Sequence, residues 1–164
     1  MSIKNFIICT SITLALGGCA TSYQGKGFTG GYSETQLDEN VFVVSFEGNG
    51  YTSKKKAAAF TMLRSAELTV NNGYQFFAII DSDSYSTNST YTTPTTSHST
   101  ANVSSFGNFA TGTSTTTFSG GQTYAISKPS NTNTIVMFKD RPANVFTYNA
   151  KFIVKSLKAE YGIE

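Results

Sequence analysis

The chain has 164 residues, of which 12 are basic and 10 acidic, so its formal net charge is +2. Such a balance supplies no broad electrostatic attraction for nucleic acid, and we predict no nucleic-acid partner. Charged residues make up only 13% of the chain, below the average of about 25%, and Ser, Thr, Asn and Gly supply the polarity instead.

An export signal is the first predicted element. Lys4 gives a positive start, Phe6–Leu16 is a short, mostly apolar run, and Gly17-Gly18-Cys19 follows. This order is typical of an export signal, and the run is too short to span a bilayer, which needs about 20 apolar residues. The end of the run resembles a bacterial lipobox. The resemblance implies cleavage before Cys19, lipid transfer to its thiol and acylation of the new N-terminus.

This interpretation leaves no thiol in the mature protein, because Cys9 leaves with residues 1–18 and Cys19 carries lipid. Cysteine nucleophiles, zinc clusters and iron–sulfur sites are thereby excluded. The alternative is an ordinary secreted protein in which a cysteine follows two glycines by chance. Residues 19–31, rich in glycine, are expected to form a lipidated flexible tether, and residues 32–164 a single domain.

A strand, a helix and a second strand are predicted at the start of this domain. Alternating side chains over Val41–Glu47 predict a strand with one buried face. Thr52 or Ser53 is expected to cap a helix that ends just before Gly73. A further strand, apolar almost throughout, is expected over Tyr74–Ile80. The predicted apolar face of the helix comprises Ala59, Met62, Leu63, Ala66 and Val70, with Phe60 and Leu68 off that face.

The chain changes character over residues 82–134, where about half of the residues are Ser or Thr. Low hydrophobicity favours disorder in such a segment, whereas Thr, Tyr and Phe favour strands. We expect a β-hairpin over Gly112–Ser127 that turns at Gly120-Gly121, and a mobile stretch around Pro94–Ala101.

The last predicted elements are a strand over Asn133–Lys139 and a helix. Asn149 is expected to cap this helix and Gly162 to close it. Its apolar face recurs at helical spacing, at Ala150, Ile153, Val154, Leu157 and Tyr161. The element order predicts an α+β two-layer domain, with two helices on a mixed or mainly antiparallel sheet and a Ser/Thr-rich β-hairpin insertion at about residues 82–134.

The residues form no recognisable catalytic, cofactor-binding or metal-binding set, so we predict a protein that is not an enzyme and has no cofactor. His98, the only histidine, has no acid near it in sequence, whereas a Ser–His–acid triad needs a carboxylate to orient its base. Asp81 and Asp83 offer oxygen ligands of the kind that calcium prefers. The alternative interpretation is that these acids simply start a turn after the strand.

Three consecutive lysines, Lys54, Lys55 and Lys56, open the first predicted helix. Cations are unfavourable at this end of the helix dipole. One interpretation is a compensating contact with anionic lipid headgroups or an acidic partner. The other is a solvated cluster that is tolerated because exposed charges cost little. The three lysines are therefore candidate contacts for a partner or for lipid.

Aromatic residues within the Ser/Thr-rich region raise a second hypothesis. Rings flanked by hydroxyls and amides can bind glycans by stacking and hydrogen bonding, although the chain has no tryptophan, the commonest such platform. The alternative is that the rings fill the outer face of the sheet. The rings belong to Tyr85, Tyr91, Phe106, Phe109, Phe118 and Tyr124.

Several motifs together resemble an uncharacterised family of small bacterial lipoproteins. The motifs are Gly31–Asn40 (GYSETQLDEN), Gly48–Ser53 (GNGYTS), Leu63–Leu68 (LRSAEL) and Gly121–Tyr124 (GQTY). The likeness extends from about residue 30 to the last helix. It implies a lipoprotein and supplies no catalytic residue. Members of that family tend to place an acid in the first helical turn, where this chain has lysines.

Together these observations predict a membrane-anchored periplasmic lipoprotein that acts as a non-enzymatic interaction or assembly module of the cell envelope. Its expected partners are the membrane, through the lipid on Cys19, and an envelope protein or peptidoglycan. Outer-membrane placement is favoured because Ala20, and not Asp, follows the cysteine; the inner membrane is the alternative. The alternative function is a glycan- or peptidoglycan-binding lipoprotein.

Overall fold

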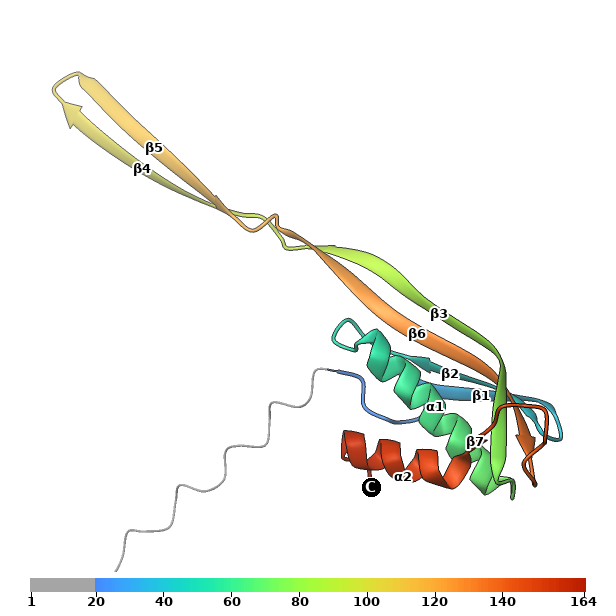
Figure 1. Ribbon diagram of the computed structural model, residues 1–164. Coiled ribbons are helices and arrows are strands. Elements are labelled where there is room, and N and C mark those ends of the chain that lie inside the picture. Colours follow the sequence, from blue (N-terminus) through green and yellow to red (C-terminus); the bar gives the residue numbers. More distant parts are fainter. Residues whose placement is uncertain (1–19) are drawn as a thin grey trace, which may run out of the picture. The chain divides into compact units, whose positions relative to one another are not determined.

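The computed structural model describes residues 20–164, so the predicted signal and Cys19 lie outside the described residues. This part of the chain is α+β, with two helices and seven strands in two mainly antiparallel sheets (Figure 1). The elements are β1 (Gly31–Asp38), β2 (Val41–Glu47), α1 (Lys54–Asn71), β3 (Phe76–Thr92), β4 (Thr96–Phe106), β5 (Phe109–Ser119), β6 (Thr123–Phe138), β7 (Tyr148–Asn149) and α2 (Ala150–Tyr161).

The chain divides into two compact units. One, here named the core unit, consists of residues 20–87 and 127–164 of the described chain. The other, named the ribbon unit, is Asn88–Ile126. Because β3 and β6 continue past the boundaries of the core unit, the ribbon unit is joined to it by two strands and not by loops alone.

The five-stranded sheet has the order β1-β2-β6-β3-β7. β2 pairs antiparallel with both β1 and β6, and Phe42 lies opposite Gln36 on one side and Ile135 on the other. Since side chains alternate across a strand, Phe42, Val44 and Phe46 share one face, and all three are buried. The strand predicted over residues 41–47, with its buried face, is confirmed.

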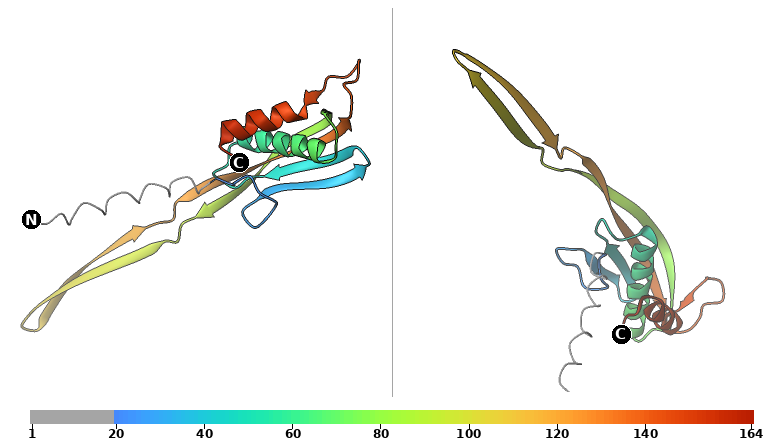
Figure 2. Two further views of the ribbon diagram at one scale, coloured as in Figure 1. Left: turned by 90° about the horizontal axis from the view of Figure 1, so that it is seen from below. Right: turned by 90° about the vertical axis from the view of Figure 1, so that its left-hand side faces the viewer.

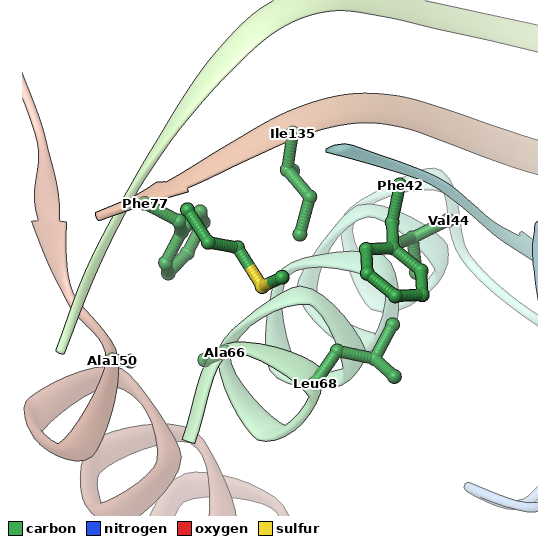
Figure 3. Packing of buried hydrophobic residues seen from close by; sticks show 8 residues of the cluster. Phe42, Val44, Ala66, Leu68, Phe77, Ile135 and Ala150 are labelled. Atoms are coloured by element: carbon green, nitrogen blue, oxygen red, sulfur yellow. The ribbon is translucent and has the colours of Figure 1, made fainter. Parts of the chain in front are cut away.

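The helix α1 supplies the opposite half of the core. Figure 3 shows Leu68 of α1 beneath Phe42 and Val44 of β2. Phe60 and Leu68, which lie off the predicted apolar face, are buried as well. The reason is that α1 has neighbours on two sides, because α2 runs beside it (Figures 1 and 2) while β2 contacts its inner face.

Both helices begin and end at the predicted residues. The side chains of Ser53 and Asn149 each accept a hydrogen bond from a backbone N–H in the first turn, at 3.1 and 3.0 Å. Each cap thus satisfies a donor that the helix itself leaves free. Gly73 and Gly162 follow the last turns with φ of 79° and 63°, the left-handed conformation that glycine adopts without strain.

Other features differ from the sequence-based expectations. β1 lacks the apolar alternation that would predict a strand, and it forms by pairing along β2. β3 and β6 continue well beyond the strands predicted over residues 74–80 and 133–139. In α2 only Ala150 is fully buried, and Ile153 and Leu157 are half-buried, because one side of this helix packs on α1 and the other meets solvent.

The ribbon unit also departs from expectation. β4 and β5 pair antiparallel along their whole length, and the pair that closes the turn is Phe106 with Phe109. The connection is Gly107-Asn108, where Gly107 has a φ of 60°, as tight two-residue turns require. The predicted turn at Gly120-Gly121 is therefore wrong. A strand also occupies most of the stretch 94–101 that we expected to be mobile.

The burial pattern predicts different costs for two equivalent truncations. Leu63→Ala should lower the free energy of unfolding by about 2–5 kcal/mol, because Leu63 is completely buried and its removal leaves a cavity. Leu157→Ala should cost less, about 1–2 kcal/mol, because this side chain is half in solvent. Denaturant unfolding of the mature chain measures both values, and an equal or larger loss for Leu157→Ala would contradict the described packing of α2.

Candidate functional site

The segment before β1 does not form the expected free tether, because Thr21 attaches it to the core unit. Thr21 is only 2% exposed. Its backbone N–H donates to Thr52 Oγ1 at 3.1 Å. Its hydroxyl donates to the backbone oxygen of Thr29 at 2.8 Å and accepts from the backbone N–H of Asn49 at 2.9 Å. The two hydrogen bonds to Thr52 and Asn49 therefore fix the chain next to the loop that precedes α1, and the third, to Thr29, closes the segment on itself.

Backbone pairing extends this attachment into β1, and we name residues 21–30 the docked segment. The backbone N–H of Lys26 donates to Tyr32 O at 2.7 Å, and that of Tyr32 donates to Gln24 O at 2.8 Å. Gly30 has a φ of 101°, and a Cβ at this position would lie 2.2 Å from the carbonyl oxygen of Glu47. Only glycine permits this close approach of the two backbone segments.

Tyr23 adds an aromatic contact to the docked segment. Its ring centroid lies 5.0 Å from that of Tyr32 and 5.3 Å from that of Phe60, distances at which aromatic pairs attract each other. Its hydroxyl donates to the carboxylate of Glu67 on α1. Burial and this hydrogen bond raise the pKa of Tyr23 above its usual range, so the hydroxyl remains a donor at neutral pH.

Arg64 is the centre of a cluster of charges beside Tyr23. Its Nη2 lies 2.7 Å from Glu34 Oε1, its Nη1 lies 3.4 Å from Glu67 Oε2, and its Cζ lies 4.4 Å from the ring centroid of Tyr32. Lys158 of α2 completes the cluster, with its Nζ 3.6 Å from Glu67 Oε1. The cluster thus joins β1, α1 and α2.

The cluster can hold the docked segment, β1 and the helices together, because the positive charge of Arg64 at its centre is permanent. Burial lowers the pKa of Arg64, but the hydrogen bond to Glu34 and the negative charge of Glu34 together raise it by more than burial lowers it. The net pKa is therefore raised, and the guanidinium stays charged. The side chains of Arg64 and Glu67 are each only 17% exposed. Three of the sequence motifs meet around the docked segment: Tyr32 and Glu34 come from the first, Asn49 and Thr52 from the second, and Arg64 and Glu67 from the third.

The three candidate lysines are placed differently from one another. Lys54 and Lys55 are exposed, and Lys55 Nζ lies 3.5 Å from Glu160 Oε1. Lys56 is half-buried, with its Nζ 5.2 Å from the ring centroid of Phe60. The first turn of α1 contains no acid. Of the three lysines, Lys54 and Lys55 are therefore more accessible to a partner or lipid surface than Lys56.

The ribbon unit offers a different kind of surface, because it has no Asp, Glu, Lys or Arg. Every residue of β4 and β5 is exposed. Alternation along the paired strands gives the two faces different side chains. One face has a row of threonines, at Thr96, Thr100, Thr111, Thr113, Thr115 and Thr117. The other is mostly small or apolar, with Ala101, Val103, Ala110, Gly112 and Phe118.

An open, shallow cavity of about 470 Å³ is lined by residues at the ends of β4 and β5, at the tip of the ribbon unit. Its walls are mainly apolar, and two exposed rings, Phe106 and Phe109, dominate them. Ser104, Ser105 and Thr111 add hydroxyls. The cavity thus combines aromatic surface with hydrogen-bonding groups.

No catalytic set assembles in the described part of the chain. His98 lies on β4 opposite Thr117, and the ribbon unit has no acid to orient it. Asp81 and Asp83 are exposed on β3. Within residues 20–164 no group of three or more His, Cys, Asp or Glu side chains is arranged to hold a metal ion. In the same residues no helix is both long and apolar enough to cross a membrane.

No family model, curated protein or solved structure matches the chain. Function is therefore inferred from the docked segment, the Arg64 cluster and the ribbon unit themselves.

Removal of one hydroxyl tests the attachment of the docked segment. Tyr23→Phe should lower the free energy of unfolding by about 1–2 kcal/mol, because it deletes a hydrogen bond to a charged carboxylate and leaves the ring in place. Tyr148→Phe is a matched control, since Tyr148 is also half-buried and its hydroxyl has no partner in the described residues. Chemical denaturation measures both, and equal stability of the two variants would argue against the described contact.

Proposed function

We propose that the protein is a lipoprotein of the bacterial cell envelope, anchored through lipid on Cys19, that acts as a non-enzymatic interaction or assembly module. Its partners are the membrane and an envelope protein or peptidoglycan. The observation that carries this proposal is the ribbon unit, whose two strands are uncharged and fully exposed.

The edges of the ribbon unit support a role in binding. β4 and β5 each have a single neighbour, so both outer edges present unpaired N–H and C=O groups. Natural proteins block such edges with charges, prolines or bulges, yet these strands have none of these features. A two-stranded ribbon is only marginally stable by itself. A partner strand that added to an edge would stabilise it and bind in the same step.

The proposal also specifies the architecture and the location. The core unit would be a two-layer domain, with α1 and α2 as one layer over the five-stranded sheet, and residues of about 82–134 would form a Ser/Thr-rich β-hairpin insertion. The contacts of α1 with β2 and α2 support this arrangement. The protein would face the periplasm from the outer membrane, because Ala20 follows the lipidated cysteine, with the inner membrane as the alternative.

The cavity at the tip of the ribbon unit favours a second candidate, glycan or peptidoglycan binding. Phe106 and Phe109 would provide rings for stacking against a sugar, and the neighbouring serines would provide hydrogen bonds. Both candidates place the contact on the ribbon unit, but they differ in the part that binds. An edge binds a strand through its backbone, whereas the tip binds a sugar through side chains.

The lipid anchor makes a direct prediction. Cys19→Ser should abolish lipid attachment and leave the uncut precursor, because the thiol that accepts the lipid is gone. Cys9→Ser is the matched control, since it removes the other cysteine and leaves Gly17-Gly18-Cys19 intact. Intact mass and fatty-acid labelling of the purified proteins provide the measurement. A Cys19→Ser protein that was cut and lipidated like the wild type would refute the anchor.

A pair of added charges tests the edges of the ribbon unit. Ser99→Lys with Ser114→Lys places one cation on each strand at exposed positions, and should abolish strand addition because charged edges repel pairing. The control pair is Asn144→Lys with Ser156→Lys, at exposed sites of the core unit.

The readout is crosslinking in intact cells followed by purification of the protein and identification of what is attached. We expect envelope proteins on the wild type and on the control pair, and their loss from the edge variant. Recovery of sugar strands that are retained by the edge variant but lost in Phe106→Ala would favour the glycan candidate instead.

A further inference from the structure

The position of Thr21 limits how far the core unit can lie from a lipid on Cys19. Thr21 is buried and held by three hydrogen bonds, so it is the first fixed point after the cysteine. Two residues of fully extended chain span at most about 7 Å. A lipid on Cys19 would therefore hold the core unit directly at the headgroup region and prevent it from standing off at a distance.

Exposed aromatic rings lie next to two of the three residues that hold Thr21. Thr29, which accepts from the Thr21 hydroxyl, follows Phe28, whose side chain is completely exposed. Thr52, which accepts from the Thr21 N–H, follows Tyr51, which is 75% exposed. Large rings gain free energy at the boundary between water and acyl chains, where tyrosine also keeps its hydroxyl in water. In water alone, two such exposed rings have no evident stabilising role.

Two accessible cations adjoin the same loop. Lys54 and Lys55 come directly after the loop that contains Tyr51, at the N-terminus of α1, where the helix dipole disfavours positive charge. Lys54 forms no ion pair with the described residues. Lys55 Nζ lies 3.5 Å from Glu160 Oε1, yet the Lys55 side chain remains 84% exposed. Lysines near an anionic membrane surface gain attraction that offsets such a cost.

We propose that Phe28, Tyr51, Lys54 and Lys55 form an anchor face that lies on the headgroup region of an anionic bilayer. The proposal rests on the lipid at Cys19 that is part of the proposed function. A bilayer, and not a protein, is the occupant, because the lipid would place these four side chains next to it at a high effective concentration. The N-terminal attachment would then orient the core unit on the membrane as well as retain it there.

The absence of tryptophan from the chain allows a clean test by single-Trp fluorescence. Phe28→Trp and Tyr51→Trp place the probe on the anchor face. Phe146→Trp is a matched control, because Phe146 is 76% exposed and precedes β7, which lies near the end of α1 opposite to Lys54 (Figure 1). Each mature, lipidated variant is reconstituted into vesicles of phosphatidylethanolamine and phosphatidylglycerol that contain a lipid with a nitroxide-labelled headgroup.

The anchor face predicts that the fluorescence of the Phe28→Trp and Tyr51→Trp variants shifts to the blue and is strongly quenched by the nitroxide, while the Phe146→Trp variant shows neither effect. Adding Lys54→Gln and Lys55→Gln to the Phe28→Trp variant should reduce the quenching. A flexible Gly/Ser linker inserted between Ala20 and Thr21 should make the remaining quenching sensitive to salt, since exposed charges are screened over about 8 Å at physiological ionic strength. Unquenched Phe28→Trp and Tyr51→Trp variants in lipidated protein would overturn the anchor face.

Intact mass of the reconstituted protein separates this inference from the proposed anchor. Lipid on Cys19 with unquenched probes would overturn the anchor face and leave the proposed function in place. A chain without lipid would refute the anchor itself. Vesicle addition to that chain at low salt would then still decide the inference, because quenching would support a membrane-binding surface and its absence would refute it. Equal quenching at all three positions would also overturn the proposal, since it would indicate no preferred orientation.

Discussion

The arrangement of the core unit depends on the contacts of one side chain, Arg64. Its guanidinium bonds to Glu34 on β1 and to Glu67 on α1, and lies over the ring of Tyr32. Glu67 in turn accepts the hydroxyl of Tyr23 and pairs with a lysine of α2. Because these charges are largely shielded from water, each depends on its partners, and a missing partner leaves an uncompensated charge. The edge strand, both helices and the docked segment therefore share one set of contacts.

The core unit and the ribbon unit are stabilised by different interactions. In the core unit, rings and aliphatic side chains of β2, β6, β3 and α1 are buried together, and the hydrophobic effect fixes one register for each strand. In the ribbon unit every side chain of β4 and β5 is exposed, so backbone pairing and cross-strand contacts between hydroxyls are the main stabilising interactions. The exposed side chains and strand edges of the ribbon unit can lose their contacts with water and bind a partner instead. The buried side chains of the core unit cannot do so without unfolding.

Apolar spacing and capping residues were enough to predict β2 and both helices. Phe42 belongs to an alternating apolar pattern, Leu63 to an apolar pattern at helical spacing, and Asn149 is a typical N-cap residue. The same signals do not reveal β1, because its inward side chains include the polar Glu34, which faces Arg64. They also fail for the ribbon turn, since Gly107-Asn108 and Gly120-Gly121 are both good turn sequences and a strand with two polar faces does not specify its register.

The docked segment was missed for a related reason. Thr21 attaches through hydroxyl and backbone hydrogen bonds that leave no mark on hydropathy, and the glycines that suggest a flexible tether include Gly30, which permits a close approach of two backbones. The candidate site could therefore be predicted only in part, through the lysines at the start of α1 and the rings of Phe106 and Phe109, which line the cavity at the tip of the ribbon unit. Which residues of the different motifs come into contact depends on the fold, and the sequence of each motif does not specify it.

The lack of charge in the ribbon unit decides how it responds to the surrounding medium. Residues 88–126 contain no Asp, Glu, Lys or Arg. Ionic strength weakens attraction between charges and leaves backbone pairing largely unaffected. A complex formed along the edges of β4 and β5 would thus persist through changes of salt concentration. The attraction of the lysines at the start of α1 to an anionic surface would weaken as salt is added, so one molecule would have a salt-sensitive surface and a salt-indifferent one.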